Sequence, residues 1–281
     1  MNIINKLKEV SKYVLILMLV LSYASCNLDE TQTVTTLNNL VWEDDFNTNG
    51  TLDASKWAYN IGTGDNGWGN NELQYYRSEN VKVQDGMLHI TAKKENFQGA
   101  GYTSGRILTK GLYEQKFGRI EARIKLPFGK GYWPAFWMLG ANLQEGVETP
   151  DDPSTVFWPL AGEIDIMEYL GNKPTTVLGS VHGPGYSGGE AVSKAYTLMN
   201  DRFDTGFHVF GIEWGENYIN YYVDNVLYNQ ITPADVSGEW VFNKPYFIIL
   251  NMAIGGNLPG SPNSETVFPQ TMIIDYVKVY Q

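Results

Sequence analysis

Short alternating runs of apolar and polar residues, separated by turn residues, fill the chain from residue 41 to its end. In the run 119–126 the even positions are apolar and the odd positions are charged, which predicts a β-strand with one face toward solvent. The runs 246–252 and 272–280 also predict strands. No run keeps a helical period for more than about three turns. We therefore expect an all-β protein.

Two hairpins are predicted, with turns at Asp85-Gly86 and Asp224-Asn225, because these residue pairs favour the tight turns that join antiparallel strands. The strands that flank these turns are expected at 81–84, 87–93, 219–223 and 226–228. The chain has 29 Gly and 12 Pro but no linker, charge block or repeat in this region. Residues 40–281 are thus expected to form one β-sandwich, a jelly roll with a concave cleft.

The N-terminal segment has the pattern of an export signal. A polar stretch with three lysines precedes an apolar run, 13–23, which is too short to span a bilayer but matches a signal peptide. The only cysteine, Cys26, follows as in a bacterial lipoprotein, which predicts a signal peptide at 1–25, a lipidated Cys26 and a flexible tether at 26–39. Tyr23 stands where lipoproteins usually have Leu, so conventional cleavage nearby is the alternative. Both alternatives predict export, and the lipoprotein reading places the domain at the outer membrane or cell surface.

Charge narrows the range of partners. The formal charge is −11, and the first 25 residues carry a net positive charge, so the remainder is more acidic still. Such a surface repels phosphate backbones and polyanionic glycans, which favours a neutral substrate. With 3 His, 1 Cys and no phosphate-binding loop, we expect no zinc, nucleotide or organic cofactor. We expect a monomer that contacts the membrane only through its lipid anchor.

The aromatic content is high, at 14% of residues, with 8 Trp and 18 Tyr. Aromatic rings suit a cleft that holds flat, amphipathic ligands, but β-sandwiches also use them freely for packing. Composition leaves both uses open.

The segment 162–169 carries three acids within an apolar strand. Glu163 and Asp165 share a face because side chains alternate along a strand, whereas Glu168 is an odd number of positions from Glu163. A single β-bulge at Ile166 and Met167 would restore the phase and bring all three acids to one face. We expect that bulge.

Three neighbouring acids have no structural benefit, because desolvation and mutual repulsion oppose their burial. The alternative is that some of them point outward as ordinary solvated charges. Retaining glycoside hydrolysis would explain the cluster, since one carboxylate attacks the anomeric carbon while another protonates the leaving oxygen. Asp165 between the two glutamates would share a proton or hydrogen bond with them.

This segment, Glu163-Ile-Asp165-Ile-Met-Glu168, resembles the signature of glycoside hydrolase family 16, whose members are β-jelly-roll enzymes. Its two residues between the Asp and the second Glu match the branch that holds laminarinases, agarases and carrageenases. Lichenases and plant xyloglucan transglycosylases lack the extra residue. The resemblance extends over nearly the whole domain, through segments 68–76, 102–106, 118–123, 133–140, 181–186, 207–214 and 250–257.

The resemblance implies roles for individual residues. Glu163 would be the nucleophile, Asp165 its assisting neighbour and Glu168 the general acid/base. The rings of Trp133 and Trp137 would line the donor subsites. Hydrogen bonds to sugar hydroxyls would come from Asn70, Arg106 and His182.

The residues themselves leave alternatives to some of these roles. Trp133 and Trp137 are four positions apart and so share a strand face, but core packing would explain them too. Trp158, five residues before Glu163, is open in the same way. Arg106 could instead be a structural partner of the acids that lowers the proton affinity of the nucleophile.

The family also often carries a structural calcium on its convex side. The matching positions are Glu43, the Gly86 carbonyl and Asp275, whose oxygens are the hard ligands that calcium prefers.

The function expected from these observations is a retaining endo-β-glucanase that cleaves β-1,3-glucan (laminarin), mixed-linkage β-1,3-1,4-glucan or both. Alternatives of the same fold are an agarase, a carrageenase or a transglycosylase. A different class of alternative is a surface lipoprotein that binds glucan without cutting it.

Overall fold

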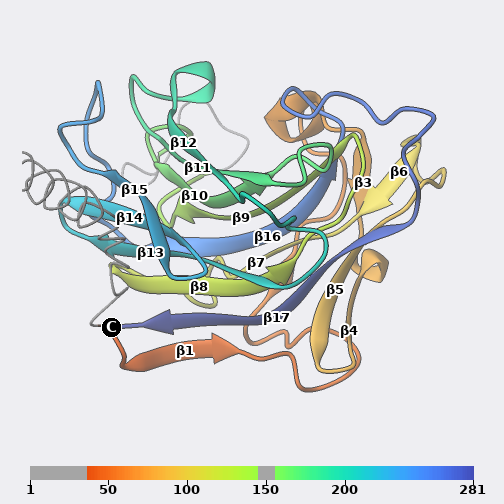
Figure 1. The fold of residues 1–281 in the computed structure, drawn as a ribbon, viewed down its shortest axis with the longest axis horizontal. Coiled ribbons are helices and arrows are strands. Elements are labelled where there is room, and N and C mark those ends of the chain that lie inside the picture. The colour runs from red at the N-terminus through yellow and green to blue at the C-terminus, as the bar shows by residue number, and fades with distance from the viewer. Residues whose placement is uncertain (1–36, 145–155) are drawn as a thin grey trace, which may run out of the picture. The chain divides into compact units, whose positions relative to one another are not determined.

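The computed structural model describes residues 37–144 and 156–281. The predicted signal peptide, Cys26 and most of the predicted tether lie outside the described residues. Two large antiparallel sheets lie face to face (Figure 1). The predicted all-β jelly roll is confirmed. Among the described residues, no helix is both long enough and apolar enough to cross a membrane.

The eight-stranded sheet has the order β15-β14-β13-β8-β17-β5-β4, and β1 pairs with β17 beside this path. Its strands are β1 Leu40–Asp44, β4 Val81–Gln84, β5 Met87–Ala92, β8 Gly118–Lys125, β13 His208–Gly215, β14 Tyr218–Val223, β15 Val226–Ile231 and β17 Gln270–Tyr280.

The seven-stranded sheet has the order β12-β11-β10-β9-β16-β7-β2, and a short parallel pair, β3 with β6, lies apart from it. These strands are β2 Ala58–Tyr59, β3 Gln74–Tyr76, β6 Tyr102–Ser104, β7 Arg106–Leu108, β9 Tyr132–Gly140, β10 Glu163–Tyr169, β11 Thr176–His182, β12 Val192–Thr197 and β16 Tyr246–Ile254. The short helical turns are η1 Gly67–Asn71, η2 Ser78–Asn80 and η3 Gly188–Glu190.

Both predicted hairpins are confirmed, as β4–β5 and β14–β15. Their turn residues have positive φ angles, 55° for Asp85, 72° for Gly86, 48° for Asp224 and 67° for Asn225. Gly, Asp and Asn adopt this region at the lowest cost, which is why these pairs close two-residue turns.

The main core lies between the two sheets. Ile120, Ala122 and Ile124 of β8 are fully buried, as the alternation predicted, and they belong to the same cluster as Phe136 and Met138 of β9. Removing each such side chain from water contributes about 1.5–3 kcal/mol for the larger residues. This core holds β9 and its neighbour β10 in place.

Two details differ from the simple pattern. Glu121, at a position expected to face solvent, is only 4% exposed, because it forms an ion pair with Arg119 on the same strand. Asn39, assigned to the tether, pairs its backbone with that of Gln281.

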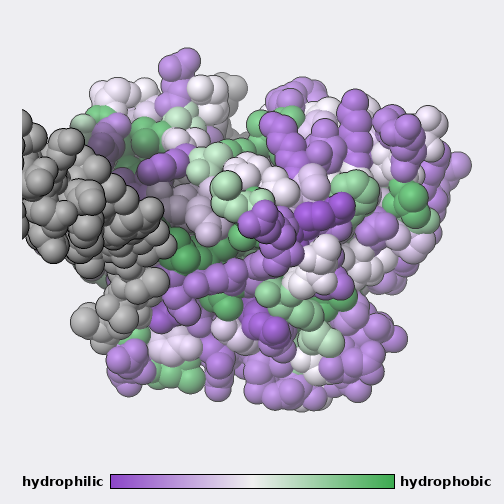
Figure 2. All heavy atoms as spheres, in the orientation of Figure 1, coloured by the Kyte–Doolittle hydropathy of each residue, from purple (hydrophilic) through white to green (hydrophobic). Residues whose placement is uncertain are grey.

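A second, small hydrophobic cluster covers one end of the other face of the seven-stranded sheet. It includes Leu139, Phe247 and Ile249, which alternate along their strands with residues of the main core. Leu143 and Ala161, from the connection between β9 and β10, complete it. The rest of this face carries polar and aromatic side chains together. Figure 2 shows a hollow in the surface at the top of the view, between the side of β11 and β12 and the side of β3 and β6.

Candidate active site

Strand β10 has the predicted bulge. Its pairing with β11 shifts register between Asp165 and Glu168, and its pairing with β9 shifts between Asp165 and Met167. Ile166 and Met167 are both buried in the main core, so two consecutive side chains point to that side. All three acids, Glu163 included, are therefore brought to the opposite face.

Neighbouring strands supply the other groups on that face. Glu163 lies opposite His182 of β11. Asp165 lies between Trp137 of β9 and Ser180 of β11, opposite both. Because directly opposed residues share a face, the acids, His182, Ser180 and Trp137 line one surface. The seven-stranded sheet thus assembles a polar site from segments that are far apart in the sequence.

Burial and mutual repulsion set the protonation of the acids. Asp165 is 3% exposed, and burial together with the charges of Glu163 and Glu168 raises its pKa well above the usual range. Burial and the charge of Glu163 raise the pKa of Glu168 to about 7. A carboxyl with this pKa still holds a proton near neutral pH, which a general acid requires.

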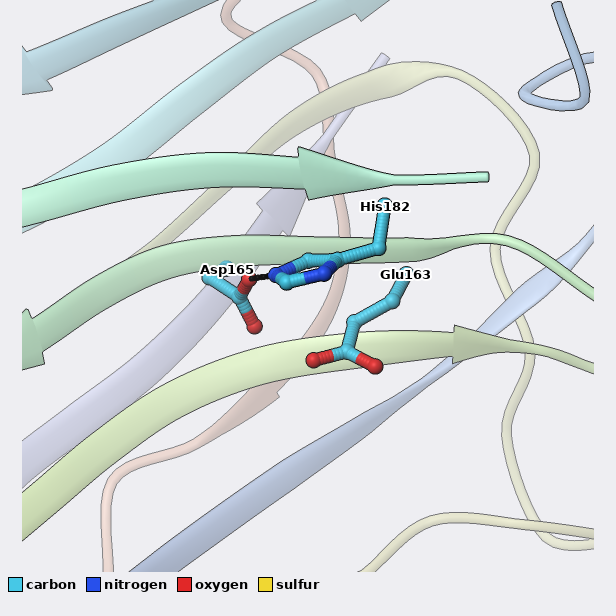
Figure 3. Close-up of side chains that lie close together, drawn as sticks. All are labelled: Glu163, Asp165 and His182. Carbon is cyan, nitrogen blue, oxygen red and sulfur yellow. Dashed lines mark ion pairs between the residues drawn. The ribbon is translucent and has the colours of Figure 1, made fainter. Parts of the chain in front are cut away.

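His182 is the basic group beside these acids. Its Nε2 lies 3.0 Å from Oδ2 of Asp165, and Figure 3 shows both side chains beside Glu163. Burial opposes the charge of His182, but the hydrogen bond and charge of Asp165 and the nearby glutamates raise its pKa to about 9. Against this, the Gly188 N–H donates to Nδ1 over 3.1 Å, which requires a lone pair there and favours neutral imidazole. The Gly188 contact favours a proton on Nε2, the ring nitrogen that lies beside Asp165.

Two tryptophans donate hydrogen bonds to the two glutamates. The indole N–H of Trp158 donates to Oε2 of Glu163 over 2.6 Å, and that of Trp133 donates to Oε1 of Glu168 over 3.1 Å. The sequence left Trp158 as either a groove residue or a core residue. In the structure its side chain is 42% exposed and lies at the site. Trp133 also contacts a catalytic candidate and is not simply a core residue.

Ser180 was not predicted from the sequence. It is 2% exposed, its hydroxyl hydrogen-bonds to Glu168 and it accepts a hydrogen bond from Ser193 Oγ over 2.8 Å. Its position two residues before His182 on one strand would have been the signal, since such residues share a face.

Arg106 lies between two indole rings. Its guanidinium carbon is 4.4 Å from the centre of the Trp68 ring and 4.9 Å from that of Trp137, and the residue is 6% exposed. Stacked rings of this kind stabilise a buried guanidinium by cation–π attraction. The charge of Arg106 acts on Glu72, whose pKa it lowers. Among the described residues, Arg106 forms no hydrogen bond or ion pair with the three acids of β10. The alternative role as their structural partner is therefore not supported.

A buried polar network joins the Arg106 region to the sheet. Trp137 donates to Asn251 Oδ1 over 2.7 Å, Asn251 donates to the Tyr76 hydroxyl over 3.1 Å, and Tyr76 donates to Glu72 over 3.0 Å. Burial raises the pKa of Glu72, although the Arg106 charge and several hydrogen bonds oppose the rise. This network was not predicted from the sequence, because its members lie in three separate segments.

Asn70 lies at the edge of this network. Its Nδ2 is 3.5 Å from Glu72 Oε1, a long hydrogen bond, and its carbonyl accepts the Asn257 N–H over 2.9 Å. The predicted substrate residues therefore lie on or beside one sheet face, with Asn70 farthest from the acids in the chain of contacts.

The three residues matched to calcium lie on the other sheet. Glu43 is in β1 and Asp275 in β17, which pair with each other along part of their length, and Gly86 is in the β4–β5 turn. The Asp275 carboxylate is 2.6 Å from Arg123, and Glu43 accepts a hydrogen bond from Lys56 through its carbonyl. These donors fit calcium only if the present ion pairs rearrange, so the site stays a prediction.

The model of glycosyl hydrolases family 16 matches residues 69–278 of this sequence. The chain belongs to that family. The match includes β10 with its bulge and every strand that lines the site, so the family assignment covers the whole face described above.

Several family 16 relatives resemble the chain closely. The catalytic domain of an endo-1,3-beta-glucanase (laminarinase) from Thermotoga petrophila RKU-1 is 46% identical, with a TM-score of 0.80 over 88% of this chain and 99% of that one. The Beta-glucanase of Rhodothermus marinus is 38% identical over 86% of this chain and 85% of its own length. The Clotting factor G alpha subunit of Tachypleus tridentatus is 40% identical, but the chain spans only 34% of its length.

Proposed function

We propose that the chain is a retaining endo-β-glucanase that cleaves β-1,3-glucan, mixed-linkage β-1,3-1,4-glucan or both. The observation that carries this proposal is the position of Glu163 and Glu168 on one face of β10, on either side of Asp165. The names of the relatives, a laminarinase and a beta-glucanase, support the substrate class.

The two glutamates divide the chemistry between them. In the first step, a carboxylate oxygen of Glu163 forms a bond to the anomeric carbon while the glycosidic bond breaks and Glu168 gives its proton to the leaving oxygen. In the second step, Glu168 takes a proton from water, the water oxygen attacks the same carbon and the ester bond to Glu163 breaks. Two inversions retain the anomeric configuration.

Asp165 and His182 shape this division. An ionised Asp165 between the glutamates would raise the proton affinity of both. Burial and the charges of Glu163 and Glu168 favour the neutral form of Asp165, whereas His182 favours its ionised form. The titration of Asp165, Glu168 and His182 belongs to the cluster, because each group feels the others.

The experiment that tests the function offers the purified protein four polymers, laminarin, barley mixed-linkage glucan, agarose and carrageenan, and follows products by NMR. Oligosaccharides of several lengths released first as the β-anomer from laminarin or barley glucan are expected. Products from agarose or carrageenan alone would contradict the glucanase assignment. Binding without cleavage of any polymer would favour a capture protein, and transfer to sugar acceptors in place of water would favour a transglycosylase.

The pH dependence of kcat/KM is expected to show an alkaline limb near pH 7. Glu168 must be protonated to act, and its pKa of about 7 means that the active fraction falls about tenfold for each further pH unit. Initial rates on laminarin between pH 4 and 10 measure this limb. A fall that begins only near pH 9 would assign it to His182, whose pKa is about 9.

We further propose that the protein works as a monomer and is exported as a lipoprotein, anchored through Cys26 at the outer membrane or cell surface. The signal-like run 13–23 and the position of the only cysteine support this. In a Gram-negative host, the full chain should fractionate with membranes and Cys26→Ser should not. Equal membrane fractions for both would contradict lipid anchoring.

Calcium at Glu43, Gly86 and Asp275 is proposed as structural only. If it binds, calcium at 100 times its Kd stabilises the fold by about 2.7 kcal/mol, and Tm rises by several degrees. Thermal melts in EDTA and in CaCl2 measure this, with Asp275→Asn as the variant expected to lose the shift. Identical melts in both solutions would contradict the site.

A further inference from the structure

The nucleophile candidate Glu163 is held by a donor from outside its own sheet. The Trp158 indole N–H lies 2.6 Å from Glu163 Oε2, which is the shorter of the two indole contacts with the glutamates. Trp158 is on the connection between β9 and β10 and so does not move with the strand as a paired residue does. Its ring also lies 6.0 Å from the His182 ring.

The turn that carries Trp158 is itself anchored. Within it, the Ala161 N–H donates to the Phe157 carbonyl and the Gly162 N–H donates to the Pro159 carbonyl. The buried Tyr246 hydroxyl of β16 donates to the Ala161 carbonyl over 3.1 Å. A donor on a turn fixed at several points can hold a carboxylate in one orientation.

Glu163 needs such a constraint. It is the first residue of β10, it follows Gly162 with a φ of 74°, and its side chain is only partly buried. Its repulsion from Asp165 and Glu168 favours rotamers that point away from them. A nucleophile displaced by about 1 Å costs roughly 10²-fold in rate.

We propose that Trp158 is a positioning residue for the nucleophile: its indole N–H holds Oε2 of Glu163 so that Oε1 faces the anomeric carbon. This inference rests on the proposed function. It gives Trp158 a role other than a stacking surface for sugar, and it assigns the corresponding role on the general acid/base to Trp133.

The proposal makes different predictions for the two tryptophans. Trp158→Phe keeps a ring but removes the N–H, and loss of a hydrogen bond to a charged group corresponds to roughly a 10- to 100-fold fall in kcat/KM. Because the nucleophile acts on every substrate, the fall should be similar for laminarin and for a 2,4-dinitrophenyl β-laminarioligosaccharide. Trp133→Phe affects proton donation, so its loss on laminarin should shrink to a few-fold on the dinitrophenyl substrate, whose leaving group needs no proton.

A matched control is Trp240→Phe, which removes an indole N–H that donates to the Glu216 carbonyl over 2.9 Å and not to an acid of β10. Its kcat/KM should equal that of the unmodified protein on both substrates. Melting curves for all three variants report whether each is folded.

The measured quantity is kcat/KM for the full-length protein, the three variants and Trp158→Ala on both substrates, since kcat/KM reports the step that forms the glycosyl ester. A Trp158→Phe loss that persists on the dinitrophenyl substrate with little change in KM supports positioning. Unchanged kcat/KM, or a loss that vanishes on that substrate, would overturn it. If only Trp158→Ala is impaired, through a higher KM, Trp158 is a sugar-stacking residue. Failure of the proposed function would appear separately, as full activity in Glu163→Gln.

Discussion

Glu163→Gln is expected to lower kcat on laminarin by at least about 10⁴-fold, because a neutral amide cannot form the glycosyl ester and losing a member of a catalytic unit removes most of its rate enhancement. The fold should be unaffected, since Glu163 is only partly buried and its one hydrogen bond, from Trp158, can be accepted by the Gln oxygen. Initial rates with laminarin and a thermal melt of the same sample measure both effects.

A second variant distinguishes a nucleophile from a residue that merely supports the site. In Glu163→Ala, azide can occupy the vacated space and attack the anomeric carbon of a dinitrophenyl β-glucoside directly. A single inversion gives the α-glycosyl azide, whereas azide acting in place of the general base would give the β-product. An α-product identifies Glu163 as the nucleophile. Near-normal hydrolysis in either variant, or only a β-product, would exclude that role.

Glu168→Gln is expected to lower kcat/KM on laminarin by about 10²- to 10⁴-fold, which is the usual contribution of a general acid. On a dinitrophenyl glycoside, kcat/KM should stay within a few-fold of the unmodified protein, because the leaving group departs without a proton. The alkaline limb near pH 7 should disappear on that substrate. An equal loss on both substrates would contradict the acid role.

The same variant should be more stable at high pH. The pKa of Glu168 is about 7 in the folded protein and 4.5 in a free glutamate. Because the folded protein holds this proton more tightly than the unfolded chain, the free energy of unfolding falls as pH rises from 4.5 to 7. The cost at pH 9 is about 3 kcal/mol, and Gln, which stays neutral, avoids it. Melts of both proteins at pH 5 and pH 9 should diverge much more at pH 9 than at pH 5. A constant difference between them would contradict this linkage.

The three acids of β10, proposed here as the catalytic residues, oppose the stability of the fold. Three carboxyls on one buried strand face repel one another, and the donors around them, Trp133, Trp158 and His182, offset part of that cost. These donors come from different elements, so the site depends on the whole seven-stranded sheet.

Much of this structure followed from local patterns. The strands, the two hairpin turns and the bulge in β10 were predicted from alternation, turn residues and a phase mismatch of one residue between Glu163 and Glu168. Each depends on residues close together in the sequence, where side-chain direction and allowed φ angles are decided by neighbouring atoms.

The partners of the acids were not predictable in this way. Nothing near Glu168 in the sequence indicates that Ser180 and Trp133 bond to it, and nothing near Arg106 indicates that Trp68 covers it. Those contacts arise from strand order and register between distant segments. The pKa shifts of the acids also depend on distant segments, because those segments decide how far each acid is buried.

The amino-acid pattern alone therefore accounts for the all-β class, the strand that carries Glu163, Asp165 and Glu168, and the shared face of these acids. The assembly of distant strands into one sheet accounts for the pKa of about 7 at Glu168, the hydrogen bond from Trp133 to Glu168 and the position of Arg106 beside Trp137. The physical reason is that alternation and turn geometry act over a few residues, whereas desolvation and hydrogen-bond partners are fixed only when remote strands meet.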